Sequence, residues 1–196
     1  ICYIAAGQGI GAGFVDDGTV ITGATGTAGE IGHTTIDYDG PLCDCGNRGC
    51  LGQYCSTIAI RKQIAAQTQH GDDESGTLEE FGSIVERYHD GDELVVSTVD
   101  KALEYLGIGI VNVVNTINPN VIVIGDELAE LGQPVLQTVQ RVVQERTVSA
   151  IYADLKIELT SMEEDPVMSG ICQMVFENAF RNPSAYLGRA TAEQPR

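Results

Sequence analysis

The chain has 196 residues, 43% of them hydrophobic, and a mean hydropathy near zero, which is the composition of a globular protein able to bury a core. Its 28 acidic and 11 basic residues give a formal net charge of −17, and such a surface repels phosphates, which excludes direct nucleic-acid binding by this chain. No apolar run reaches the roughly 20 residues that span a bilayer, and no basic-then-apolar leader opens the sequence. We therefore expect a cytoplasmic protein without a membrane partner.

The beginning of the chain alternates short β-rich runs with glycines. The pattern predicts a strand over residues 1–6, a glycine loop over 7–13 and a hairpin that turns at Asp17-Gly18. Because the first strand begins at Ile1 with no methionine before it, we expect a fragment whose upstream part lies outside this chain.

The rest of the chain alternates helices with short strands after an irregular stretch, residues 24–52, which is too poor in periodic apolar residues for a helix. The predicted elements then follow in order: a helix from residue 58, an exposed turn over 71–76, a helix opened by a capping box at 77–80, a long apolar helix over 93–114, a buried strand over 121–124, a helix over 131–146, a strand over 155–159 and a helix over 167–180. Gly107 and Gly109 mark close packing in the long helix, and Asn118-Pro119 ends it. This order indicates the α/β class.

A cluster of metal-ligand residues lies in the irregular stretch. The spacing H-x9-C-x-C-G-x2-G-C supplies one imidazole and three thiolates, from His33, Cys43, Cys45 and Cys50. Zinc prefers these soft donors in closed tetrahedral sites, and four protein ligands leave no position for water, so we predict a structural zinc. Gly46 and Gly49 allow the backbone to wrap the ion. The alternative is a chance grouping of cysteines beside a core histidine.

The six cysteines also bear on the redox compartment. Three of them fall within eight residues beside glycines, which is typical of a metal site in a reducing compartment rather than of a secreted disulfide framework. The other three have apolar neighbours in the sequence, and we expect buried core thiols at Cys2, Cys55 and Cys172.

Two further features have alternative interpretations. The run that contains Gly7, Gln8, Gly9 and Gly11 follows a strand, so its backbone N–H groups could cradle a phosphate, but a tight turn between packed strands explains the glycines equally well. Glu30 lies three residues before His33, where a carboxylate beside an imidazole suits sugar hydroxyls. A solvated acid is the alternative at this position.

Three motifs together resemble one family. The stretches GIGAG (9–13), GTAGEIGH (26–33) and CDCGNRGCL (43–51) are similar to the signature of ROK proteins, which are repressors, open reading frames and sugar kinases. The stretches INPNVIVIGDELAELG (117–132) and NPSAYL (182–187) extend the resemblance over nearly the whole chain. It implies an actin-like ATPase (ribonuclease H-like) lobe of the ROK type with an inserted zinc loop.

The resemblance also implies boundaries and roles. Residues 1–189 would form the C-terminal part of a ROK domain with its zinc loop at 29–52, followed by a frayed tail at 190–196. The ROK pattern has zinc on the histidine and three cysteines, sugar contacts from Glu30 and His33, and a nucleotide region at Gly125. A homodimer or homotetramer is expected.

Departures from the family pattern favour a regulator. The family commonly has a sugar-contacting glutamate at the position of Gly52, and kinase members usually have a threonine where Gln8 stands and a second glycine where Asp126 stands. Phosphoryl transfer depends on neutralising phosphate charge, so a carboxylate there is unfavourable. We predict the sugar-binding effector domain of a ROK transcriptional regulator, which would contact DNA only through a domain outside this chain. The alternatives are a ROK sugar kinase lobe, which would need ATP and Mg, and a degenerate module kept for assembly.

Overall fold

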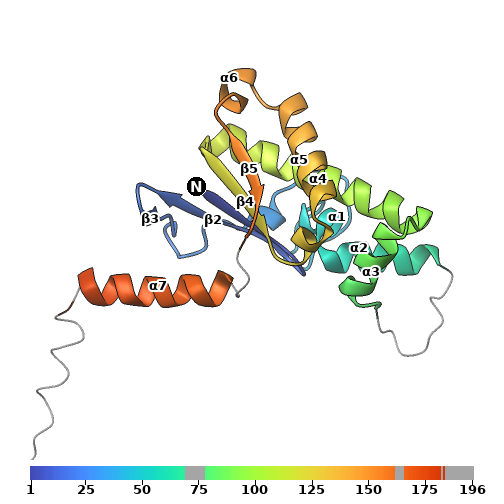
Figure 1. Cartoon of the computed structure of the whole chain (residues 1–196), viewed down its shortest axis with the longest axis horizontal. Helices are drawn as coiled ribbons and strands as arrows, with labels where there is room; N and C mark the ends of the chain where they lie inside the picture. Colours follow the sequence, from blue (N-terminus) through green and yellow to red (C-terminus); the bar gives the residue numbers. More distant parts are fainter. Residues whose placement is uncertain (69–77, 162–165, 182, 184–196) are drawn as a thin grey trace, which may run out of the picture. The chain divides into compact units, whose positions relative to one another are not determined.

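A computed structural model describes residues 1–68, 78–161, 166–181 and 183 (Figure 1). The chain divides into two units, Ile1–Thr160 and Ser161–Arg196, and each is described by itself. The first unit contains the sheet, the core and the candidate site, and the second contains helix α7, Pro166–Arg181. Among the described residues, no helix combines the length and the apolar character needed to cross a membrane.

A five-stranded sheet forms the frame of the first unit. Its strands are β1 (Cys2–Ala6), β2 (Ile10–Asp16), β3 (Thr19–Val20), β4 (Val121–Gly125) and β5 (Lys156–Leu159), in the order β3-β2-β1-β4-β5. β1 and β2 are antiparallel, whereas β4 runs parallel to both β1 and β5. The predicted hairpin is confirmed, because Asp17 and Gly18 have the positive φ angles, 44° and 69°, of a tight two-residue turn.

The parallel pairing of β1 with β4 determines which loops meet. Ala5 pairs with Gly125, so the chain leaves both strands at the same edge of the sheet. The turn that contains Gly7 therefore lies beside Asp126, although 118 residues separate them in the sequence. In open α/β sheets this carboxyl edge is the usual place for a ligand.

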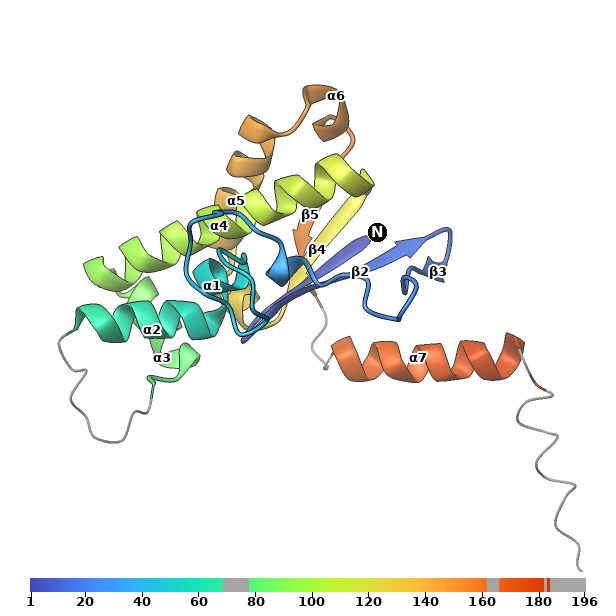
Figure 2. The same cartoon turned by 180° about the vertical axis from the view of Figure 1, so that it is seen from behind.

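One face of the sheet carries the core. Alternate residues of β1 and β4, including Ile4, Ile122 and Ile124, are fully buried and belong to one cluster with the apolar face of helix α4, Glu93–Ile117. Helix α5, Gln133–Arg146, packs beside α4 (Figure 2). The expected close packing at the α4 glycines is confirmed: a methyl group on Gly107 would lie 2.8 Å from the Val142 side chain of α5.

The remaining helices of the first unit are short. They are the 3-10 turns η1 (Ile31–His33) and η2 (Glu127–Leu131) and the α-helices α1 (Gly52–Cys55), α2 (Thr57–Gln67), α3 (Phe81–His89) and α6 (Ser149–Tyr152). The predicted helix over 131–146 is interrupted at Gly132, whose φ of 70° separates η2 from α5. The turn expected over 71–76 lies outside the described residues.

The capping box predicted over 77–80 begins at Thr77, which lies outside the described residues, and the helix start that it predicted is wrong. Helix α3 begins at Phe81, and its N-cap Glu80 makes no side-chain capping bond. Leu78 precedes the helix and accepts a hydrogen bond from the Arg61 guanidinium at 2.9 Å through its backbone carbonyl. This contact joins residues 17 positions apart in the sequence, so no local motif predicts it.

The structure corrects one of the three expected core thiols. Cys2 and Cys55 are buried, and burial raises the pKa of Cys2 to about 12 and that of Cys55 further still. Cys172 is exposed on α7, together with its apolar neighbours Ile171 and Met174.

Candidate functional site

The loop of residues 29–52 is held by its own backbone. Ile36 N–H donates to the Gly49 carbonyl at 2.9 Å, and Cys43 N–H donates to the Asn47 carbonyl at 2.7 Å, which folds the loop back on itself. The glycine prediction is confirmed, because Gly46 and Gly49 have φ angles of 90° and 64°. A methyl group on Gly49 would collide with the Asp37 carbonyl at 1.5 Å, so only glycine fits there.

This loop brings the four predicted metal ligands together. The donor atoms of His33, Cys43, Cys45 and Cys50 all lie within 4.8 Å of one another. Cys43 Sγ lies 3.6 Å from His33 Nδ1, and Cys45 Sγ lies 3.7 Å from Cys50 Sγ. Around a tetrahedral zinc, with bonds of about 2.3 Å to sulfur and about 2.0 Å to nitrogen, two sulfurs lie about 3.8 Å apart, and a sulfur and a nitrogen lie about 3.6 Å apart. The cluster therefore fits a metal ion of this size and geometry.

The electrostatics of the cluster also favour a cation. Hydrogen bonding to the Cys45 backbone, together with weaker bonds from neighbouring side chains, lowers the pKa of the Cys43 thiol to about 7. Burial and hydrogen bonding to Cys45 and Cys43 raise the pKa of Cys50 to about 11. A divalent cation between the three sulfurs would stabilise all of them as thiolates.

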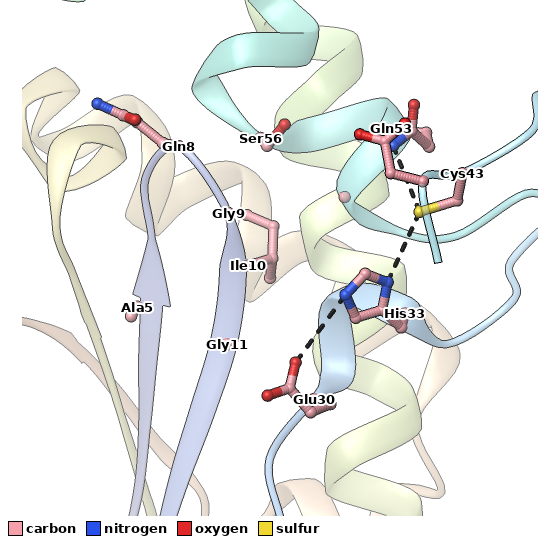
Figure 3. A pocket seen from close by; sticks show the side chains of 12 residues that line it. Ala5, Gln8, Gly9, Ile10, Gly11, Glu30, His33, Cys43, Gln53 and Ser56 are labelled. Carbon is pink, nitrogen blue, oxygen red and sulfur yellow. Dashed lines mark hydrogen bonds and ion pairs between the residues drawn. The ribbon is translucent and has the colours of Figure 1, made fainter. Parts of the chain in front are cut away.

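A cavity of about 400 Å³ opens beside the cluster. Its walls come from the β1–β2 turn, from the loop of residues 29–52, which we call the metal loop and which contains η1, and from α1. Figure 3 shows the side chains that face the cavity. Glu30 and His33 both line it, and His33 Nε2 lies 4.0 Å from Glu30 Oε2. Since Nδ1 of the same ring faces Cys43, His33 joins the metal cluster to the cavity.

The predicted phosphate loop only partly reaches this cavity. Gln8, Gly9 and Gly11 line it, but Gly11 is part of strand β2 rather than of the turn. Gly7 does not line the cavity; its N–H donates to the Gly9 carbonyl at 3.0 Å and its carbonyl accepts from Thr57 N–H at 2.9 Å. The turn therefore already uses both backbone groups of its first glycine.

A carboxylate lies directly against this turn. A methyl group on Gly7 would come within 2.6 Å of the Asp126 carboxylate, which also accepts from Glu127 N–H at 2.9 Å. Asp126 has a φ of 72°, a conformation that favours glycine. Gly125 is not among the residues that line the cavity, and a methyl group there would collide with the Tyr3 hydroxyl.

Three polar residues of the cavity wall were not predicted from the sequence, namely Asp44, Gln53 and Ser56. Gln53 Nε2 donates to Cys43 Sγ at 3.5 Å, so its amide is attached to the metal cluster. Ser56 is buried and caps α2 by accepting from Ala59 N–H at 3.1 Å. Gln53 follows Cys50 by three residues, which indicates that it lies near the cluster. The sequence does not show which face of helix α1 it occupies.

Comparison with known proteins gives the same family over most of the chain. A model of the ROK family matches residues 1–177. The xylose repressor of Caldicellulosiruptor bescii is 30% identical over 189 residues, covering 93% of this chain and 47% of the repressor. The glucokinase of Halalkalibacterium halodurans is 34% identical over 148 residues, covering 70% of this chain and 44% of the glucokinase. The chain thus spans about half the length of the curated relatives that it matches.

Solved structures agree. A ROK family transcriptional regulator, described as a homolog of the E. coli MLC protein, is 35% identical with a TM-score of 0.72, covering 81% of this chain and 41% of that one. A ROK family glucokinase from Streptomyces griseus, solved with glucose and AMPPNP, has a TM-score of 0.69 at 23% identity, covering 81% of this chain and 54% of that one, and shows the shared fold. These likenesses confirm the α/β class and the kinase-type fold, and the chain belongs to the ROK family.

Proposed function

We propose that this chain is the sugar-binding effector part of a ROK transcriptional regulator, with a structural zinc in the loop of residues 29–52. The observation that carries the proposal is the cavity in which Glu30 and His33 lie together while the other ring nitrogen of His33 faces the cysteine cluster. Relatives named as repressors support the regulatory role.

The proposed zinc has His33, Cys43, Cys45 and Cys50 as its ligands. Four protein ligands complete a tetrahedral shell, so the ion would stabilise the loop and take no part in chemistry at an open position. It would fix the ring of His33, and the fixed ring would in turn present Nε2 to the cavity beside Glu30.

The proposed ligand is a neutral sugar. Glu30 and Asp44 place carboxylates on the cavity wall, and none of its described lining residues is Lys or Arg. Carboxylates accept hydrogen bonds from sugar hydroxyls but repel phosphate groups. The pocket should therefore bind a free sugar more tightly than the corresponding sugar phosphate.

The second candidate is a ROK sugar kinase lobe, which the similarity to named glucokinases favours. Against it stands the Asp126 carboxylate packed on Gly7, where a phosphate-binding turn would need positive charge or free N–H groups. Gln8, Gly9, Gly11 and Gly125 remain candidates for a phosphate and nucleotide site only under this alternative.

Three further parts of the proposal concern the whole protein. With its net charge of −17, this chain would leave DNA contact to a domain outside it. The cysteines of the metal loop form no disulfide, as is typical of a reducing compartment, so we place the protein in the cytoplasm. We propose a homodimer or homotetramer as its assembly and residues 1–189 as the C-terminal part of the ROK domain.

A thermal-shift screen of the full-length protein tests the proposal. The probes are xylose, glucose and N-acetylglucosamine, each with its phosphate ester. We expect one free sugar to raise the melting temperature, since a ligand at about 100 times its Kd adds about 2.7 kcal/mol of stability. No shift with any free sugar, or a larger shift with the phosphate ester, would contradict the proposed ligand.

A further inference from the structure

Gln53 lines the cavity and is hydrogen-bonded to the metal cluster, and the chemistry of the two partners determines which of them is the donor. Its Nε2 lies 3.5 Å from Cys43 Sγ, within reach of an N–H···S bond. A cysteine that ligates a metal is a thiolate, which accepts hydrogen bonds and cannot donate them. The amide must therefore direct its NH₂ group at Cys43, because its carbonyl oxygen would be repelled there.

This anchoring determines where the other end of the amide lies. With Nε2 held by Cys43, the carbonyl oxygen Oε1 is on the opposite branch of the planar amide and is a free acceptor toward the cavity that Gln53 lines. Figure 3 shows dashed lines that run from Glu30 to His33, from His33 to Cys43 and from Cys43 to Gln53. Gln53 thus ends a continuous chain of polar groups along one side of the cavity.

The neighbouring residues give this position further weight. Gly52 also lines the cavity but offers no side chain, and a methyl group there would meet only the Gly32 carbonyl at 3.4 Å. Packing therefore does not require glycine at 52. The other side chains of α1 are engaged elsewhere: Tyr54 donates to Asp37 at 3.3 Å, and Cys55 is buried. Gln53 is the one side chain of α1 that faces the cavity.

We propose that Gln53 is a specificity-determining residue of the sugar site. Its Nε2 is anchored on the Cys43 thiolate, and its Oε1 accepts a hydrogen bond from one hydroxyl of the bound sugar. The inference rests on the proposed function, because it assumes that a sugar occupies this cavity. It adds a role for the metal cluster, which then orients two recognition groups, the ring of His33 and the amide of Gln53.

The test is a thermodynamic cycle that measures the affinity after removal of the Gln53 amide, of single sugar hydroxyls, and of both together. Full-length wild type and Gln53→Leu are titrated calorimetrically with glucose, xylose and N-acetylglucosamine, and then with the monodeoxy derivatives of the sugar that binds. Gln67→Leu is the matched control, because Gln67 lies exposed at the end of α2 with its Nε2 on the Gln63 carbonyl. Zinc content is measured in every variant, and Gln53→Met, which keeps the chain length, replaces Gln53→Leu if that variant fails to fold.

We expect one hydroxyl to couple to Gln53. Removing it should weaken binding about five- to tenfold in wild type and in Gln67→Leu but less than twofold in Gln53→Leu, which has already lost the bond. Equal losses for every deoxy sugar in both proteins would mean that Gln53 only packs, and would overturn the inference while leaving the sugar site intact. A wild type that binds none of the sugars would remove the proposed function and this inference together.

Discussion

The cavity has two walls that differ in how their residues are held. On the metal-loop wall, side chains with directional donors and acceptors are oriented by the cluster, through His33 Nδ1 and Gln53 Nε2, each near Cys43 Sγ. On the glycine-turn wall, the backbone of Gly7 is already bonded and the Asp126 carboxylate lies against it. Under the proposed function, the metal-loop wall supplies the groups that recognise sugar hydroxyls, whereas the glycine-turn wall offers a phosphate neither positive charge nor the N–H group of Gly7.

The largest expected effect comes from removing a metal ligand. Cys45→Ser should lose the metal and more than about 3 kcal/mol of the free energy of unfolding, because metal binding in such loops is coupled to folding. Elemental analysis and urea denaturation measure the two effects. Cys172→Ser is the matched control, since this exposed thiol on α7 lies outside the cluster.

Wild-type protein should then purify with one zinc per chain. A metal content well below one equivalent, or a Cys45→Ser variant as stable as Cys172→Ser, would contradict a structural metal in the loop of residues 29–52.

The next effect concerns sugar affinity. Glu30→Ala should weaken binding of the cognate sugar about ten- to a hundredfold, because hydrogen bonds to a charged group contribute about 1.5–3 kcal/mol. Zinc content should not change, since Glu30 is not among the clustered donors. Calorimetric titration checks the affinity, and equal affinities in wild type and variant would leave Glu30 as a solvated acid.

Packing behind the metal loop should also be sensitive. Leu51, which follows Cys50, is fully buried, and a methyl group on Gly109 of α4 would lie 2.3 Å from its Cδ2 atom. Gly109→Ala should therefore lower the free energy of unfolding by about 1–3 kcal/mol through overpacking. Gly82→Ala in α3, where nothing lies within 4 Å, should instead stabilise the helix by about 0.5–1 kcal/mol. Chemical denaturation of both variants tests the contrast, and two equal shifts would contradict it.

The smallest effect is expected on the glycine-turn wall. Gln8 is exposed, and Figure 3 shows its side chain turned away from Glu30 and His33. Gln8→Ala should change sugar affinity less than about twofold, as is usual for a surface substitution that removes no contact. A tenfold loss by the same titration would show that this wall also recognises the sugar.

The sequence alone predicted the parts of the molecule that depend on short-range spacing. The hairpin at Asp17-Gly18, the β4 strand and the convergence of four metal ligands follow from turn chemistry, apolar runs and a Gly-rich loop of 24 residues. Each of these features depends on residues that lie no more than 24 positions apart in the sequence.

Features that depend on tertiary contacts were not predictable. The bond between Arg61 and the Leu78 carbonyl just before α3 joins residues 17 positions apart, and Cys172 is exposed although its neighbours in the sequence are apolar. The sequence placed Asp126 near an anionic ligand, but the pairing of β1 with β4 was needed to put it on Gly7. The amide of Gln53 could be oriented only once the position of Cys43 Sγ was known.

A single NMR sample can distinguish a pocket that only binds a sugar from one that phosphorylates it. Saturation-transfer NMR is recorded on the full-length protein with glucose, xylose, N-acetylglucosamine, ATP and Mg²⁺ in one sample, and sugar phosphate is quantified by its phosphorus signal. We expect saturation transfer to one sugar and no sugar phosphate. Formation of sugar phosphate at about 1 per second or faster, in the usual range for enzymes, would contradict it, as would the absence of transfer to every sugar.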